Sequence, residues 1–291
     1  MIGSQLADQL ADKGYDIVLL SRDKNKSSKY TTCTWDVSSG FIESKALENV
    51  DYIVHLAGAG VADKRWTDER KKVLASSRID SAQLIYNHLK NKKQKIKAFI
   101  SASAIGIYGF DTGSILLKED RKQLGDDFLA TLTKKWEAAA DQFSDISEKV
   151  VKLRIGLVLS AKGGLLDKLV PITKFGLGSA FGSGDQYMSW IHIRDLVNMF
   201  IEAIEKDTMD GVYNAVAPNP VTNKEFLETL SGVLNRPFFL PNTPKFLMRM
   251  ALGELASAVT GGNKVSSEKI SMTGFEFKFQ TLRESLEDLL A

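Results

Sequence analysis

The sequence predicts an α/β protein built on a doubly wound parallel sheet. Strands that are buried on both faces read as continuous apolar runs, and strands that alternate with helices form parallel sheets. Segments with apolar positions at helical spacing separate the apolar runs of this chain, which indicates helices between the strands. The apolar runs are DIVLL, YIVHLAG, KAFISAS and KVVKLRIGLVLS.

The chain opens on the second half of a strand–helix–strand unit. Leu6 and Leu10 lie four residues apart with Gly14 behind them, which predicts a short helix. Residues 17–20 then form an apolar run that we interpret as a buried strand. A helix and a parallel strand of this kind normally follow a strand and a glycine-rich turn. We therefore expect that this strand and turn are missing from the start of the sequence.

Two longer helices are predicted in the middle of the chain, by DERKKVLASSRIDSAQLIYNHLKN and by DDFLATLTKKWEAAADQF. After LVLS the chain is rich in glycine and turns helical from about Asp195, and GVYNAV predicts a late strand that returns to the main sheet. Shorter helices follow from Pro218 onward. The sequence thus predicts a core of residues 1–160, joined by 187–216, and a smaller region of residues 161–186 and 217–291 that closes over the strand ends.

The composition excludes several classes of protein. With 291 residues, of which 44% are hydrophobic, the chain can bury a large core. Its 38 Lys and Arg nearly balance its 36 Asp and Glu, so the net charge favours neither nucleic acid nor an acidic membrane surface. The single cysteine, Cys33, suits a reducing cytosol, and no apolar run approaches the roughly 18 residues that span a bilayer. We expect a cytoplasmic protein without a nucleic-acid or membrane partner.

Along nearly its whole length the chain resembles the extended short-chain dehydrogenases/reductases, and within them the nucleoside-diphosphate-sugar epimerase-like subgroup. The resemblance implies a Rossmann-like fold, with residues 1–160 as the dinucleotide-binding core and the smaller region on the substrate side. Eight segments carry it in the right order: HLAGAGVADKRWTDERK, SSRIDS, SASAIGIYG, KKWEAAA, LRIGLVLS, GSGDQYMSWIHIRDLV, NAVAPNPVTNKEF and GFEFKFQTLRESLEDLL.

The resemblance also identifies what the start lacks. In this family a strand runs into a G-x-x-G-x-x-G turn, and MIGS matches the end of that turn with Gly3 as the third glycine. A misassigned or trimmed start is favoured over a natural truncation, because the rest of the chain looks intact. These glycines let the backbone approach the cofactor pyrophosphate at the start of the next helix. The missing strand would be central, and its loss would leave unpaired backbone on two neighbouring strands.

The end of the second family strand indicates which dinucleotide is bound. An acid at this position favours NAD by binding the ribose 2′-hydroxyl, whereas an arginine can bind the 2′-phosphate of NADP. This chain has Ser21 and Arg22 there, which favours NADP with NAD as the second choice. The alternative is that Arg22 is a solvated residue just past a strand.

Further residues match cofactor positions of the family. Asp36 matches a position near the adenine, and it is equally typical of a turn or a helix cap. Leu56, Ala57 and Gly58 match the strand end that runs beside the cofactor, where small residues permit close approach of the backbone.

The resemblance predicts only part of the catalytic group. Family members use a tyrosine, a lysine four residues later that lowers the tyrosine pKa, and a serine that orients the substrate oxygen. The serine is Ser103, but Leu129 stands at the tyrosine position and Thr133 at the lysine position. Tyr108, on the loop after the Ser103 strand, is the candidate substitute, with a half-buried structural ring as the alternative. Lys134 and Lys135 are rotated away on the helix and are expected to face solvent or a neighbour.

Loops at the strand ends supply candidates for the substrate side, for each of which a surface or structural role is equally open. Arg78 stands where many relatives have an asparagine near the active site. His192 is expected to make a structural hydrogen bond near the start of a helix, and no metal site is predicted. The candidates are Lys64, Arg65, Trp66, Arg78, Gln186, Met188, Ser189 and Trp190.

Two functions follow from this pattern. The first is an NADP-linked oxidoreductase or epimerase that acts on a small polar substrate, with a nucleotide sugar as one form of it. The alternative is a dinucleotide-binding protein with little or no catalysis and a regulatory role, because the Tyr-x-x-x-Lys pair is absent. A monomer or a homodimer is expected in either case.

Overall fold

A parallel sheet in the order β11-β7-β5-β4 forms the centre of the molecule. The structure is a computed structural model that describes residues 1–23 and 28–291. GVYNAV forms β11 and pairs with β7, so the late strand returns to the main sheet as the sequence predicts. The bounds of these strands are β4 (Tyr52–His55), β5 (Ile96–Ala104), β7 (Ser147–Ile155) and β11 (Gly211–Ala215).

A second, smaller sheet lies beside the first. It consists of β1 (Val18–Ser21), which pairs in parallel with β2 (Thr31–Asp36), and of β3 (Phe41–Ile42), which is antiparallel to β2. Within the described residues β1 pairs only with β2 and β4 only with β5, so each has one edge without a partner strand. The missing first strand and glycine turn stay a prediction.

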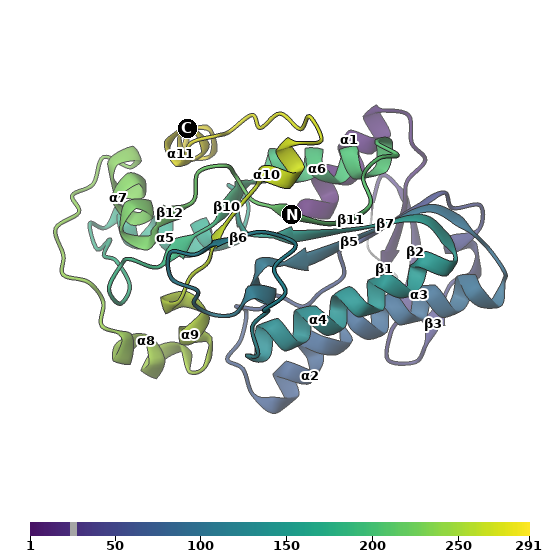
Figure 1. The fold of residues 1–291 in the computed structure, drawn as a ribbon, viewed down its shortest axis with the longest axis horizontal. Coiled ribbons are helices and arrows are strands. Elements are labelled where there is room, and N and C mark those ends of the chain that lie inside the picture. The colour runs from purple at the N-terminus through teal and green to yellow at the C-terminus, as the bar shows by residue number, and fades with distance from the viewer. Residues whose placement is uncertain (24–27) are drawn as a thin grey trace.

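Helices cover both faces of the main sheet, and this confirms the doubly wound fold class. α3 and α4 lie on one face, and α1 and α6 lie on the other (Figure 1). The neighbouring β5 residues Phe99 and Ile100 are both fully buried and belong to the two different cores. Apolar runs therefore mark strands that are covered on both sides. These helices are α1 (Ile2–Asp12), α3 (Ile79–Asn91), α4 (Phe128–Asp141) and α6 (Ile193–Glu205).

The segment expected as one long helix is broken in two, which corrects the prediction. α2 (Asp68–Ser76) ends before Ser77, and α3 begins at Ile79. The reason is tertiary, because the break binds the loop after β4. The Ala59 amide donates a hydrogen bond of 2.9 Å to Ser77 Oγ, and Arg78 Nη2 donates one of 3.0 Å to Ala59 O.

The run KVVKLRIGLVLS is also divided, at Gly156, between β7 and β8. The Gly156 amide donates to Ala215 O, and a side chain at Gly156 would begin 2.4 Å from Ser189 O. No side chain fits at that distance, so glycine is required for the crossing. β8 (Leu157–Leu159) then pairs in parallel with β10 (Trp190–His192).

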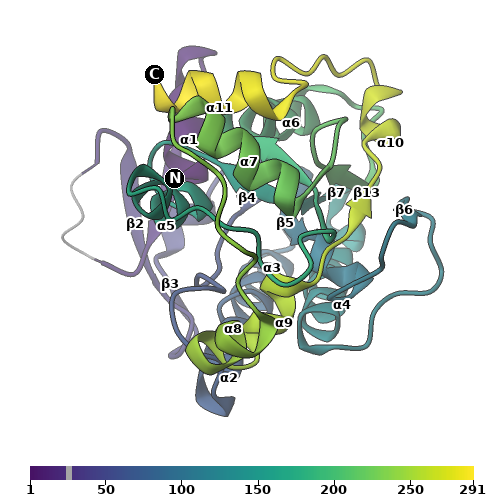
Figure 2. The same cartoon turned by 90° about the vertical axis from the view of Figure 1, so that its left-hand side faces the viewer.

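A smaller group of helices lies beyond the carboxyl ends of β5 and β7, around α5, α7, α8 and α9 (Figure 1). Figure 2 shows α8 at one end of this group and α11 next to its other end, beside α7. Among the described helices none is long and apolar enough to cross a membrane. The remaining elements are η1 (Ser44–Leu47), η2 (Ile105–Tyr108), β6 (Leu116–Leu117), η3 (Gln142–Asp145), α5 (Leu165–Lys174), β9 (Tyr187–Met188), β12 (Val221–Thr222), α7 (Asn223–Val233), α8 (Lys245–Leu252), α9 (Leu255–Thr260), β13 (Lys264–Val265), α10 (Glu268–Ser271) and α11 (Leu282–Leu290).

Candidate functional site

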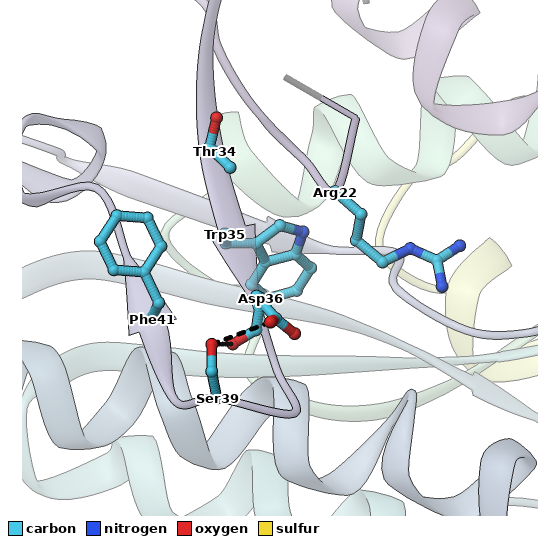
Figure 3. A pocket seen from close by; sticks show the side chains of 6 residues that line it. All are labelled: Arg22, Thr34, Trp35, Asp36, Ser39 and Phe41. Carbon is cyan, nitrogen blue, oxygen red and sulfur yellow. Dashed lines mark hydrogen bonds between the residues drawn. The ribbon is translucent and has the colours of Figure 1, made fainter. Parts of the chain in front are cut away.

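A cavity of about 470 Å³ lies at the carboxyl ends of β1 and β2. Arg22 follows β1 and Asp36 ends β2, so two of the predicted cofactor residues border one cavity (Figure 3). Arg22 is exposed and forms no ion pair with any described residue. The cavity is lined by Arg22, Thr34, Trp35, Asp36, Ser39 and Phe41.

Asp36 organises the turn that closes this cavity. Its carboxylate accepts hydrogen bonds from the Ser38 amide (2.9 Å), from Ser38 Oγ (2.7 Å) and from Ser39 Oγ (2.8 Å). These bonds, led by that from the Ser38 hydroxyl, hold the pKa of the Asp36 carboxyl below its usual range. Ser21, the last residue of β1, accepts a hydrogen bond from the Asp23 amide. Asp36 thus stays ionised within this turn, and Arg22 supplies a positive charge at the same cavity.

The start of α1 adjoins the end of β4. A side chain at Gly3 would begin 3.5 Å from Leu56 Cδ1, so these two predicted cofactor residues lie together. Met1 Sδ in turn lies near Gly163 and Gly164, at the start of α5. The first turn of α1 therefore lies beside the residue that follows β4.

Arg78 lies against the strand end that continues from Leu56. A side chain at Gly58 would begin 3.0 Å from Arg78 Cζ, so only a residue as small as glycine lets the guanidinium lie there. Ala57, between them, packs against the core that α3 and β5 share. Arg78 therefore links the predicted cofactor strand to a second cavity.

This second cavity, of about 160 Å³, lies at the carboxyl ends of β5 and β7. One face of α4 forms much of its wall, because Leu129, Leu132, Thr133 and Trp136 follow the i, i+3, i+4, i+7 spacing of a helix face. The helical spacing of Trp136 from Leu129 places both on one face of α4. This spacing could have identified Trp136 as a lining residue from the sequence. The lining residues are Val61, Arg78, Ala104, Ile105, Gly106, Leu129, Leu132, Thr133, Trp136, Ile155, Gly156 and Leu157.

The two positions where the family carries its tyrosine and lysine both face this cavity. Leu129 presents an apolar side chain, and the Thr133 hydroxyl donates a hydrogen bond of 2.7 Å to Leu129 O. Lys134 and Lys135 are exposed, which confirms that they turn away. The helix therefore offers the cavity no group that exchanges a proton near neutral pH.

Ser103 is bound to a buried ion pair. Its Oγ donates a hydrogen bond of 2.6 Å to Glu137 Oε1. Glu137 also accepts from Arg154 Nε at 2.8 Å and from Arg154 Nη2 at 2.9 Å, in a bidentate pair. All three side chains are buried. Sequence reasoning missed Glu137 as the partner of Ser103 and Arg154 as the partner of Glu137.

Tyr108 joins the same network from the loop after β5. Its hydroxyl lies 2.8 Å from Asn214 Oδ1 and accepts a hydrogen bond of 3.1 Å from Arg154 Nη1. Burial raises the pKa of the Tyr108 phenol despite the nearby Arg154 charge. The structure thus connects Tyr108 to Ser103 through Arg154 and Glu137, and neither Tyr108 nor Ser103 lines the 160 Å³ cavity.

Most of the other predicted substrate-side residues make hydrogen bonds within the fold. Lys64 and Arg65 are exposed, and Arg65 lies beside Gly253. His192 accepts from the Arg194 amide at 3.0 Å, which confirms its structural hydrogen bond. Hydrogen bonds are donated by Trp66 to Val61 O, by Gln186 to Phe181 O, by Ser189 to Asn263 O and by Trp190 to Asn219 O, and the Met188 sulfur accepts one from Asn223.

In the part of the chain that the structure describes, no cluster of His, Cys, Asp and Glu is arranged to hold a metal ion.

Comparison with known proteins identifies relatives that are named as epimerase family proteins. Residues 1–131 match the NAD dependent epimerase/dehydratase family, and residues 243–289 match a domain of unknown function (DUF1731). An epimerase family protein of Staphylococcus aureus (strain NCTC 8325) is 36% identical over 292 residues, which cover 100% of this chain and 96% of that protein. The epimerase family protein YfhF of Bacillus subtilis (strain 168) is 32% identical, over 100% of this chain and 95% of its own.

A solved structure of similar size agrees. The crystal structure of human epimerase family protein SDR39U1 (isoform2) with NADPH superposes with a TM-score of 0.86 and 30% sequence identity. The match covers 99% of this chain and 95% of that chain. The chain therefore belongs to the NAD dependent epimerase/dehydratase family, and hence to the extended short-chain dehydrogenases/reductases that its sequence resembles.

Proposed function

We propose that the chain binds NADP across the carboxyl ends of its strands and is an NADP-linked oxidoreductase or epimerase. The observation that carries this proposal is the 470 Å³ cavity in which Arg22, without an ion pair among the described residues, stands beside Asp36. An arginine at this strand end suits the 2′-phosphate of NADP, whereas an acid would suit NAD. The NADPH in the human relative's structure supports the same choice.

The remaining cofactor contacts follow the edge of the sheet. The first-turn amides of α1 near Gly3 bind the pyrophosphate, and the segment Leu56–Gly58 runs beside the cofactor towards Arg78. Ser21 and Asp36 bind the adenosine end. When bound, the nicotinamide supplies or accepts a hydride. A small polar carbonyl compound or a nucleotide sugar is the substrate.

In this proposal Ser103 orients the substrate oxygen and Tyr108 exchanges a proton with it. Both hydroxyls are bonded to other groups, Ser103 to Glu137 and Tyr108 to Asn214 and Arg154. For Ser103 and Tyr108 to act in catalysis, the substrate must replace these hydrogen bonds. The exposed residues Lys64 and Arg65 are proposed to bind polar groups of the larger substrates at the mouth of the site.

A second candidate function is dinucleotide binding with little or no catalysis and a regulatory role. The observation that favours it is the wall of the 160 Å³ cavity, where Leu129 and Thr133 replace the proton-transfer pair of the family. Both candidates require the cofactor, and they differ only in turnover.

Cofactor binding is tested by the shift in melting temperature on titration with NADPH and with NADH. We expect NADPH to raise the melting temperature more than NADH, because a ligand that binds only the folded state stabilises it by mass action. Arg22→Gln is expected to weaken NADPH binding about tenfold or more and to leave NADH unchanged. Arg283→Gln on α11 is the matched control. A wild-type protein that responds to neither dinucleotide rules out both candidate functions.

Turnover separates the two candidates. NADPH oxidation is measured with a panel of carbonyl compounds in the wild type and in Tyr108→Phe. Loss of turnover in Tyr108→Phe, with NADPH binding retained, supports Tyr108 as the acid. Equal turnover in both proteins removes Tyr108 from the mechanism. Absence of turnover in both, with NADPH bound, favours the regulatory role.

A further inference from the structure

Arg78 is a buried cation that lacks a carboxylate partner among the described residues. Its side chain is 92% shielded from solvent, since its relative exposure is 8%. The comparable residue Arg154 is 5% exposed and has a bidentate partner in Glu137. Arg78 is held instead by two neutral carbonyl oxygens, Leu74 O at 3.0 Å from Nη1 and Ala59 O at 3.0 Å from Nη2. An unpaired charge inside a protein is costly unless a ligand neutralises it.

The guanidinium retains donors for such a ligand. An arginine has five N–H groups in a planar fork. Nη1 donates to Leu74 O and, at 3.5 Å, to Ser77 Oγ, and Nη2 donates to Ala59 O. Nε and the second N–H of Nη2 make no hydrogen bond to a described residue. Burial, with the neighbouring Arg70 charge, lowers the pKa of Arg78 to about 10, so the side chain stays charged at neutral pH.

The side chains around Arg78 indicate the polarity and the size of the rest of the ligand. Leu129, Leu132, Ile155 and Leu157 line the cavity with aliphatic side chains. Its volume of about 160 Å³ is well below the roughly 300–1,000 Å³ of sites for drug-sized ligands. The ligand end that enters is therefore short and aliphatic.

Trp136 provides a second, independent indication of a polar ligand. It lines the cavity, and its ring centroid lies 5.1 Å from Arg78 Cζ. Its indole N–H is buried and makes no hydrogen bond within the described chain. Buried polar groups nearly always have a partner, so this donor also awaits an acceptor.

We propose that this cavity binds a small aliphatic carboxylate, with Arg78 as the anion-binding residue and Trp136 as a second donor. A planar carboxylate matches the guanidinium fork, whereas a doubly charged phosphate would need more than the one cation that lines this cavity. The role of this carboxylate as the substrate of the hydride transfer rests on the proposed function; its binding does not, because it is measured without a cofactor.

The test compares two probes of nearly the same shape, butanoate and butanamide, by titration of tryptophan fluorescence in the absence of dinucleotide. Butanoate is expected to bind the wild type about tenfold or more tightly than butanamide, because a charge-assisted hydrogen bond is about twice as strong as a neutral one. Trp136→Phe assigns the fluorescence change to the cavity. Inorganic phosphate is titrated in parallel.

Substitutions at Arg78 then identify the anion-binding group. Arg78→Gln is expected to reduce butanoate affinity about tenfold or more and to leave butanamide unchanged. Arg78→Lys, which keeps the charge but loses the fork, is expected to fall between them. Arg283→Gln on α11 makes the same change in net charge at an exposed site, and we expect it to have no effect. The melting temperature of each variant reports whether the fold is kept.

The outcomes are distinct. Preference for butanoate that disappears in Arg78→Gln supports the inference. Equal binding of the two probes, binding of neither, or equal loss in Arg283→Gln overturns it, and so does tighter binding of phosphate than of butanoate. If Arg78→Gln does not fold, the wild-type preference and Arg78→Lys decide the matter. A protein that binds butanoate but no NADPH keeps the anion site and loses the proposed function.

Discussion

At the scale of single residues, the site depends on how each buried charge is neutralised. Glu137 and Arg154 form a bidentate pair to which Ser103 and Tyr108 are bound. Breaking such a pair by removing one partner is costlier than never forming it, because the other charge stays buried. The network thus fixes the two hydroxyls relative to β5 and β7.

We expect Glu137→Ala to lower the free energy of unfolding by about 3–5 kcal/mol, because Arg154 and Ser103 lose their shared acceptor. Urea denaturation measures this change. Glu205→Ala is the control, since Glu205 pairs with Lys13 at the surface at 2.9 Å and such solvent-screened pairs contribute little to stability. Equal losses in the two variants would contradict the structural role of the buried pair.

His55 predicts a pH dependence of stability. It is 2% exposed, its Nε2 lies 2.8 Å from Ser81 Oγ, and burial lowers its pKa from 6.5 to about 4. The unfolded state therefore binds more protons than the folded state between these values, so stability rises with pH across this window. The contribution, up to about 3 kcal/mol, is present above pH 6.5 and is lost as the pH falls towards 4.

Urea denaturation at a series of pH values between 4 and 7 checks this. The slope of the unfolding free energy against pH is expected to be smaller in His55→Gln than in the wild type, because glutamine does not titrate. His192, whose pKa burial also lowers to about 4, keeps its own contribution in the variant. An unchanged slope in His55→Gln would show that His55 is not the titrating group.

At the scale of elements, the positions of the breaks set the geometry of the site. The break between α2 and α3 places Arg78 against Gly58. The break at Gly156, between β7 and β8, lets the end of β7 pass close to Ser189. The break between α2 and α3 falls in the polar run of residues 76–78, and the break between β7 and β8 falls at a single glycine; neither carries a proline. Both arise from contacts with segments far along the chain, such as Ala59 with Ser77 and Gly156 with Ser189.

We expect Gly156→Ala to destabilise the protein by about 1–3 kcal/mol or more, because its methyl group would begin 2.4 Å from Ser189 O and 2.8 Å from Val216 Cγ1. Gly232→Ala in α7 is the matched control. Its nearest neighbour is Arg283 Nη2 at 3.6 Å, so the same substitution is expected to stabilise by about 0.5–1 kcal/mol through helix propensity. Thermal unfolding measures both, and a stabilising Gly156→Ala would contradict the close crossing.

At the scale of the whole molecule, the arrangement of strands predicts an order of local stability. β5 is flanked by β4 and β7, and β7 by β5 and β11, whereas β1 has a partner on one side only within the described residues. Val18 of β1 is 40% exposed, while Phe99 and Ile100 of β5 are fully buried.

Hydrogen exchange followed by mass spectrometry is therefore expected to show the amides of β5 and β7 exchanging about tenfold or more slowly than those of β1 and β2. The ligand-free protein is used, so that cofactor does not protect one sheet. Similar exchange in the two sheets would mean that they open as one cooperative unit, against this prediction.

Much of the fold could be predicted from the sequence, because burial on both faces leaves a local record in runs such as KAFISAS. That Arg22 and Asp36 border one cavity could be predicted as well, since Arg22 directly follows β1 and Asp36 ends β2. The cavity wall could be predicted only in part: Leu129 was found by resemblance, while Trp136 needed the helix period. The bonds of Ser103 to Glu137, 34 positions away, and of Glu137 to Arg154, 17 positions away, leave no pattern in the sequence.

Main-chain oxygens hold the Arg78 guanidinium in place, and this has a consequence for protein engineering. Leu74 O and Ala59 O persist whatever side chains stand on α4, so the cation and the opposite wall can be varied separately. Libraries that randomise Leu129, Leu132 and Thr133 would then explore new chemistries around one fixed positive charge.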